Sequence, residues 1–168
     1  MEIPIYQIDA FTDATFAGNP AAVCPLEGWL DDGRLQAIAA ENNLSETAFF
    51  VARDDGDFDL RWFTPVAEVE LCGHATLATG YLILTRLEPK RESVAFLTLS
   101  GRLQVTRDGG RLTMDFPANP AAPMAAPEGL GHALGCEADE VLATDNHYLA
   151  VLGHERAVLG LAPDMAGI

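Results

Sequence analysis

The sequence is poor in basic residues and in cysteine, and it has no long hydrophobic run. Its 168 residues include 10 Lys and Arg against 25 Asp and Glu, which gives a formal net charge of −15 at pH 7. A nucleic-acid-binding protein neutralises phosphates with a basic face, and anionic membrane surfaces attract basic segments. The composition therefore argues against nucleic acid and against a membrane surface as partners.

No stretch approaches the roughly 20 consecutive apolar residues of a membrane-spanning helix. The most apolar segment, 75–84, is short and is interrupted by two threonines and a glycine. The N-terminus reads Met-Glu-Ile-Pro and lacks the basic region that opens a signal peptide. Since 49% of the residues are hydrophobic, we expect a folded protein and not a disordered chain.

The three cysteines, Cys24, Cys72 and Cys136, are widely spaced, and none lies in a CxxC pair. The odd number and the wide spacing favour a cytoplasmic protein with reduced thiols over a disulfide framework. No Cys pair has the spacing of a zinc site, and the four histidines form no HExxH pattern. The sequence therefore predicts no metal site.

Hydrophobic periodicity predicts an α+β fold. Phe58, Leu60 and Trp62 alternate with charged residues, as in a half-buried strand, whereas 74–86 is apolar nearly all round, as in a buried helix. We expect a curved, mostly antiparallel sheet wrapped around this central helix. The other predicted elements are a helix over 32–42, capped by Asp31 or Asp32, and strands over 3–10, 21–24, 47–52, 93–100, 102–107 and 111–116.

Prolines suggest a division of the chain. Four of the ten lie in 117–127, which we interpret as a Pro/Ala-rich linker between a first lobe, 1–116, and a segment over 128–168. A piece of that size rarely supports its own core, so we expect the beginning of a second, incomplete lobe. Its predicted elements are a helix over 128–136, strands over 141–143, 148–152 and 157–161, and a helix opening at Pro163.

The segment 42–50, Asn-Asn-Leu-Ser-Glu-Thr-Ala-Phe-Phe, places Glu46 where a helix gives way to an apolar strand. Desolvation by the neighbouring Leu44, Ala48 and Phe49 would suit this carboxyl group to proton transfer near neutral pH. The alternative is a surface glutamate at a strand end, which the residues alone favour because most glutamates are exposed.

The segment 70–76, Glu-Leu-Cys-Gly-His-Ala-Thr, leads into the buried helix. The free N–H groups of a helix start form an anion site, which Gly73 would leave open and His74 could complete. The alternative for His74 is a capping role. Cys72 is either a nucleophile or acid/base group or, as we prefer, part of the core. Asn19 either contacts a substrate carboxylate or caps its turn.

Six motifs occur together: Asp9-Ala-Phe11, Phe16-x-Gly-Asn-Pro-Ala-Ala-Val23, Asn43-Leu-Ser-Glu-Thr47, Arg61-Trp-Phe-Thr-Pro65, Glu68-Val-Glu-Leu-Cys-Gly-His-Ala-Thr76 and the helix after it. In this order they resemble the PhzF-like (phenazine biosynthesis-like) family of the diaminopimelate epimerase-like superfamily. The resemblance implies two lobes, each a curved sheet around a central helix, with the active site between them. It also implies a homodimer.

The resemblance further implies cofactor-independent isomerisation or epimerisation of a small carboxylate-bearing substrate. By motif, Glu46 is similar to the family's acid/base residue, and Gly73 and His74 to its ligand-binding turn. The resemblance also implies supporting contacts from Ser45 and Asn19. The epimerase branch uses a cysteine pair instead, which places this chain on the PhzF-like side and leaves Cys72 structural.

One departure from the family pattern concerns the second lobe. The family carries an Asp-Pro-x-x-Gly-Ser-type segment there, and nothing like it occurs over 127–168. An alternative to the enzyme is therefore a truncated, non-catalytic homologue that binds a small carboxylate or only self-associates.

Overall fold

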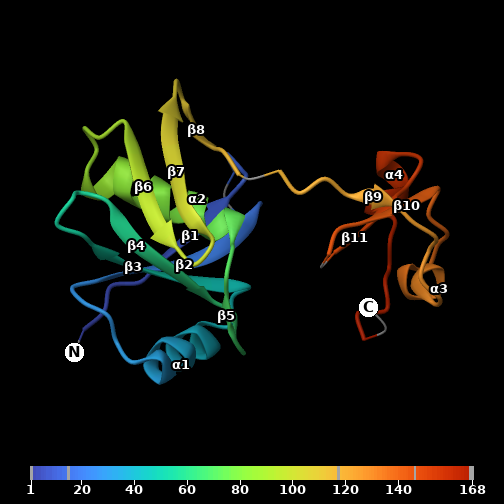
Figure 1. Cartoon of the computed structure of the whole chain (residues 1–168), viewed down its shortest axis with the longest axis horizontal. Coiled ribbons are helices and arrows are strands. Elements are labelled where there is room, and N and C mark those ends of the chain that lie inside the picture. Colours follow the sequence, from blue (N-terminus) through green and yellow to red (C-terminus); the bar gives the residue numbers. More distant parts are fainter. Residues whose placement is uncertain (1, 15, 117, 146, 167–168) are drawn as a thin grey trace. The chain divides into compact units, whose positions relative to one another are not determined.

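A computed structural model describes residues 2–14, 16–116, 118–145 and 147–166 (Figure 1). The chain divides into two compact units, Met1–Phe116 and Pro117–Ile168. In the first unit the strands are β1 (Tyr6–Ala10), β2 (Asn19–Leu26), β3 (Glu46–Ala52), β4 (Phe58–Phe63), β5 (Glu68–Val69), β6 (Ser93–Thr98), β7 (Gly101–Asp108) and β8 (Arg111–Met114), and the helices are α1 (Asp32–Asn42), α2 (Gly73–Leu82) and the π-helical turn η1 (Ile83–Leu87).

These strands form one curled sheet in the order β1-β2-β3-β4-β6-β7-β8, with β5 paired to β4 (Figure 1). The sheet is mixed, because β2 pairs with β3 and β4 pairs with β6 in parallel, while the other neighbours are antiparallel. A helix lies in each parallel crossover, α1 between β2 and β3, and α2 between β4 and β6. Parallel neighbours need such long connections, which explains both exceptions.

The expected half-buried strand is confirmed as β4. Phe58, Leu60 and Trp62 are buried, whereas Asp59 and Arg61 are partly exposed. The helix expected over 32–42 is also confirmed with the same bounds, and of the two aspartates proposed as its cap, Asp31 accepts from the Arg34 N–H at 3.0 Å.

The two faces of the sheet carry two hydrophobic clusters. Ala48 and Phe50 of β3 belong to the cluster around α2, whereas Phe49 between them packs with the cluster around α1. Successive strand residues point to opposite faces, so β3 separates the two cores. Phe49 also meets Phe63 of β4 edge to face, with ring centroids 5.7 Å apart.

Helix α2 packs against β1, β2, β3, β7 and β8, and seven of its ten residues are buried. Its buried hydroxyls are satisfied within the helix, since Thr76 donates to the Cys72 carbonyl and Thr79 to the Ala75 carbonyl. Gly80 lets the helix approach β7 closely, because a Cβ there would lie 2.8 Å from the Val105 side chain. The helix expected over 74–86 thus exists, but its last turn is the π-helical η1.

The second unit holds β9 (Ala122–Pro123), α3 (Leu130–Leu134), β10 (Glu140–Ala143), β11 (Tyr148–Val151) and α4 (Glu155–Leu159). Its sheet is antiparallel, in the order β11-β10-β9. Within the expected linker, 117–127, residue 117 lies outside the described residues. Two residues of that segment form β9, which pairs with β10, and the pairing continues in a hydrogen bond from the Met124 N–H to the Val141 carbonyl.

Two expectations for this unit are wrong. The segment predicted as a strand over 157–161 largely forms α4, because the His154 ring caps the helix by accepting from the Ala157 N–H at 2.9 Å. No helix opens at Pro163 within the described residues, and the Asp164 N–H instead donates to the Ala133 carbonyl. As far as the chain is described, none of its helices combines the length and hydrophobicity needed to cross a membrane.

The close approach of α2 to β7 predicts that Gly80→Ala destabilises the protein. Alanine favours a helix by about 1 kcal/mol over glycine, but overpacking against a rigid valine costs about 1–3 kcal/mol. Because all three side-chain carbons of Val105 would lie 2.8–2.9 Å from the new Cβ, we expect a cost in the upper part of this range and a net loss of about 1–2 kcal/mol in urea unfolding. Gly28→Ala is the matched control, since nothing lies within 4 Å of a Cβ there. A Gly80→Ala protein as stable as wild type would contradict the close packing.

Candidate functional site

Glu46 lies on the α2 side of the sheet. It is the first residue of β3, and its register partner on β2 is Ala21. Because strand residues alternate between faces, Glu46 shares a face with Ala48 and Phe50, which pack with α2. Its side chain is 20% exposed, so the carboxyl group is partly but not fully withdrawn from water.

A left-handed residue directs the chain from α1 into β3. Asn43 ends α1 with φ 49°, and its N–H donates to the Ala39 carbonyl. Asparagine tolerates this conformation better than most residues. Ser45 follows, and its hydroxyl donates to Oδ1 of Asn19 at 3.3 Å. The structure thus places Ser45 and Asn19 together, directly before β3 and at the start of the neighbouring β2.

Gly18 sets the position of Asn19. Its φ of 79° is left-handed, and a Cβ at this position would lie 2.3 Å from the Ala10 carbonyl oxygen. Only glycine fits such a site without moving the backbone. Steric exclusion of any side chain therefore explains why the Phe-x-Gly-Asn-Pro motif has glycine at position 18.

The turn that leads into α2 is anchored by an arginine. Nε and Nη2 of Arg61 donate to the two carboxylate oxygens of Glu68 on β5, each at 2.7 Å, and Nη1 donates to Asp32 at 3.0 Å. These bonds raise the pKa of Arg61, with Glu68 as the largest cause. Only two residues separate the end of this anchored strand β5 from Cys72, the N-cap residue of α2.

Glu46, Cys72 and His74 come together at this helix start. Nε2 of His74 lies 3.3 Å from Oε2 of Glu46, and Nδ1 lies 3.5 Å from Sγ of Cys72. The His74 side chain is 9% exposed, and its Nε2 is buried without hydrogen-bond geometry to any partner among the described residues. The imidazole thus lies between a carboxyl group and a thiol, with one ring nitrogen left for a further contact.

Burial raises the pKa of the Cys72 thiol to about 12, and the negative charge of Glu46 contributes in the same direction. A thiol with this pKa stays protonated at neutral pH and is a poor nucleophile. The side chain also belongs to the core cluster around α2. These observations support the interpretation of Cys72 as a core residue over the reactive-cysteine alternative.

Gly73, the first residue of α2, is half-buried. A Cβ there would lie 3.7 Å from the ring of Phe116, so the phenyl group stands next to the helix start. Sequence analysis missed Phe116 as a residue of this site. The residues next to Phe116 in the sequence give no sign of a functional site. Its position beside Gly73 depends on the path of the chain after β8, which local patterns do not predict.

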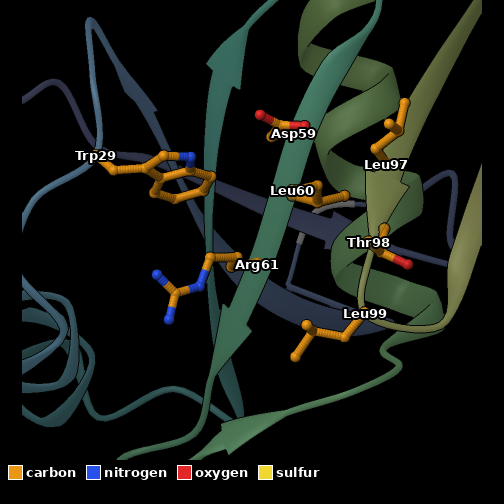
Figure 2. A pocket seen from close by; sticks show the side chains of 7 residues that line it. All are labelled: Trp29, Asp59, Leu60, Arg61, Leu97, Thr98 and Leu99. Atoms are coloured by element: carbon orange, nitrogen blue, oxygen red, sulfur yellow. The ribbon is translucent and has the colours of Figure 1, made fainter.

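A hollow in the described part of the molecule lies elsewhere. It has about 250 Å³ and is lined by the seven residues of Figure 2, among them Trp29, Asp59 and Arg61. Its charged groups already have partners, since Arg61 binds Glu68 and Asp59 binds Arg53 at 2.8 Å. Arg61 also lies over the Trp29 ring, 5.3 Å from its centroid. We therefore assign this hollow a structural role and take the helix start of α2 as the candidate site.

The fold matches solved structures of known type. A crystal structure of a PhzF-family phenazine biosynthesis protein from Enterococcus faecalis superimposes with a TM-score of 0.90 at 40% sequence identity. It is matched over 99% of this chain and 64% of its own. A similar putative PhzC/PhzF protein from Clostridium difficile gives a TM-score of 0.85 at 37% identity, covering 99% of this chain and 63% of that one.

Sequence comparison agrees with the fold. The model of the phenazine biosynthesis-like protein family matches residues 8–165. An uncharacterized isomerase of Pseudomonas aeruginosa is 58% identical over 166 residues, which are 99% of this chain and 63% of that protein. The human phenazine biosynthesis-like domain-containing protein is 46% identical over 130 residues, 73% of this chain and 45% of the relative.

The chain therefore belongs to the phenazine biosynthesis-like (PhzF) family, which confirms the resemblance carried by its motifs. It spans about 63% of the length of the Pseudomonas relative. The roles of Glu46, Gly73, His74, Ser45 and Asn19, and the homodimer, stay predictions.

The buried thiols predict an order of alkylation under native conditions. Burial also raises the pKa of Cys24 to about 12, whereas Cys136 is partly exposed. At pH 8 roughly one in 10⁴ molecules with such a pKa carries the thiolate, so Cys24 and Cys72 should react slowly. Iodoacetamide labelling followed by peptide mass spectrometry should show Cys136 modified first. Labelling of Cys72 as fast as Cys136 would contradict its burial.

Proposed function

We propose that this protein is a cofactor-independent isomerase that moves a proton on a small carboxylate-bearing substrate. The observation that carries the proposal is the contact between the Glu46 carboxyl group and Nε2 of the buried His74, 3.3 Å apart, at the start of α2. A partly desolvated carboxylate beside a histidine is suited to general acid/base chemistry. The names of relatives that are called isomerases support the same reaction type.

In the proposed reaction the Glu46 carboxylate removes a proton from a carbon atom of the substrate. The protonated carboxyl group then returns the proton to a different carbon, so that protons and electrons balance and no oxidant is consumed. The negative charge that develops on the substrate is stabilised by the helix start, where backbone N–H groups and the positive end of the helix dipole favour anions.

His74 would bind the substrate carboxylate beside the acid/base group. The protonated thiol of Cys72 can donate to Nδ1 only if that nitrogen carries no proton, which leaves the imidazole proton on Nε2, facing Glu46. In this tautomer the Nε2–H group is free to donate a hydrogen bond to the substrate carboxylate beside Glu46. Gly73 would leave room for that carboxylate at the backbone, and Ser45 and Asn19 would bind polar groups beside it. The non-catalytic alternative is not favoured by the isomerase names of the relatives.

Glu46→Gln tests the proposed role. Glutamine keeps the shape of the side chain but cannot accept a proton, so we expect isomerisation to fall by about 100-fold or more. The measurement is deuterium incorporation from D₂O into a panel of small carboxylates, followed by proton NMR. Wild-type protein should exchange a carbon-bound proton in at least one member of the panel.

Glu41→Gln, at an exposed position of α1, is the matched control and should leave the exchange rate unchanged. Circular dichroism would verify that both variants fold. Exchange that proceeds in Glu46→Gln at the wild-type rate would refute Glu46 as the acid/base group. A wild-type protein that exchanges none of the panel would count against the isomerase activity of this chain.

A further inference from the structure

We infer that Glu46, Cys72 and His74 form a binding site for one exchangeable divalent ion of the Zn²⁺ type. Each residue offers one ligand atom, and these atoms all lie within 4.8 Å of one another. This is the single group of three metal-ligand side chains found in the described residues. One thiolate, one imidazole and one carboxylate are ligands that Zn²⁺ takes in proteins.

The unsatisfied nitrogen of His74 is an independent observation that points to a ligand. Its side chain is 9% exposed, and Nε2 has no hydrogen-bond partner among the described residues although Oε2 of Glu46 is 3.3 Å away. A buried polar atom without a partner is costly and calls for an explanation. Zinc bonds of about 2.0–2.2 Å to nitrogen and oxygen in tetrahedral geometry separate the two ligand atoms by about 3.3–3.5 Å. The observed separation of Nε2 and Oε2 fits this range.

Charge balance supports an ion of charge +2. In the ion-bound state the Cys72 sulfur has released its proton, so its thiolate and the Glu46 carboxylate together carry two negative charges and a bound Zn²⁺ leaves the buried cluster neutral. Neutral clusters avoid most of the penalty of placing charge in the protein interior. A monovalent or trivalent ion would leave one net charge in the same place.

Two features of the cluster make the ion exchangeable. The Cys72 thiol is buried in the core cluster around α2, so an ion must displace its proton and reach a shielded sulfur atom before it can bind. The two ring nitrogens of His74 face different partners, Nδ1 toward Cys72 and Nε2 toward Glu46. A side chain must therefore rotate before one ring nitrogen, the thiolate and the carboxylate can all bind the same ion. Three protein ligands also leave the fourth position open, as in zinc sites that bind water or substrate.

The consequence for activity rests on the proposed function. An ion bound to Glu46 occupies the carboxylate that would remove the substrate proton. Zn²⁺ therefore acts as an inhibitor that competes with the small carboxylate substrate, and chelators restore the activity.

Cobalt tests binding without using activity. Co²⁺ replaces Zn²⁺ in such sites and reports its ligands in its absorption spectrum. We expect one equivalent of Co²⁺ to give a near-ultraviolet thiolate band together with the visible bands of tetrahedral coordination, and Zn²⁺ to remove both. Cys72→Ser should abolish the thiolate band and, like Glu46→Gln, weaken binding by about 100-fold. Cys136→Ser is the matched control, because it replaces a cysteine outside the cluster, and this variant should bind Co²⁺ as tightly as wild type.

Three results would overturn the inference: no thiolate band in wild type, a band that survives in Cys72→Ser, or binding that is unchanged in Glu46→Gln. Circular dichroism identifies any variant that fails to fold, and Glu46→Gln then serves as the second ligand variant. The test separates this inference from the proposed function. Cobalt binding without deuterium exchange would refute only the function, whereas exchange without cobalt binding would refute only the metal site.

Discussion

The burial of α2 in the curl of the sheet is the constraint on which the rest of the first unit depends. The helix has almost no polar face of its own, and its threonine hydroxyls bond to carbonyls one turn earlier. Gly80 has no side chain at the point where the helix comes closest to Val105, so the helix packs tightly against the sheet. Its position leaves little freedom at its first turn, where Cys72, Gly73 and His74 lie. A buried helix thus provides a rigid support for the chemistry proposed at its start.

Two segments far apart in the chain supply the site, and each is held by different forces. Glu46 is placed by the alternation of β3, since the residues that share its face belong to the core around α2. His74 is placed by the helix, whose entry strand is tied by the paired bonds from Arg61 to Glu68. Two rigid elements therefore fix the separation of Glu46 and His74, and a flexible loop would not.

Local patterns predicted much of the fold and little of the geometry at the site. The helix over 32–42 and the alternating strand around Leu60 followed from periodicity, because those patterns act over a few residues. The parallel pairs β2–β3 and β4–β6 did not, since pairing partners depend on crossovers between distant segments. Glu46 and His74 are 28 positions apart in the sequence, so patterns of residue spacing could not predict their contact. The residues were found instead through their resemblance to family motifs. In the second unit, a histidine cap made a helix where hydrophobic residues had suggested a strand.

The alternation of β3 also limits how genes for this fold can change in length. A one-residue insertion or deletion inside β3 would put Glu46 out of step with the residues after the change, and those residues would exchange the α2 face for the α1 face. The exposed turn at 54–56, between β3 and β4, lies beyond the paired residues and can absorb such changes. Length differences among related chains should therefore occur in turns such as this one. Between Gly18 and Ala48 we expect them only in the segment that connects β2 to β3, which includes α1.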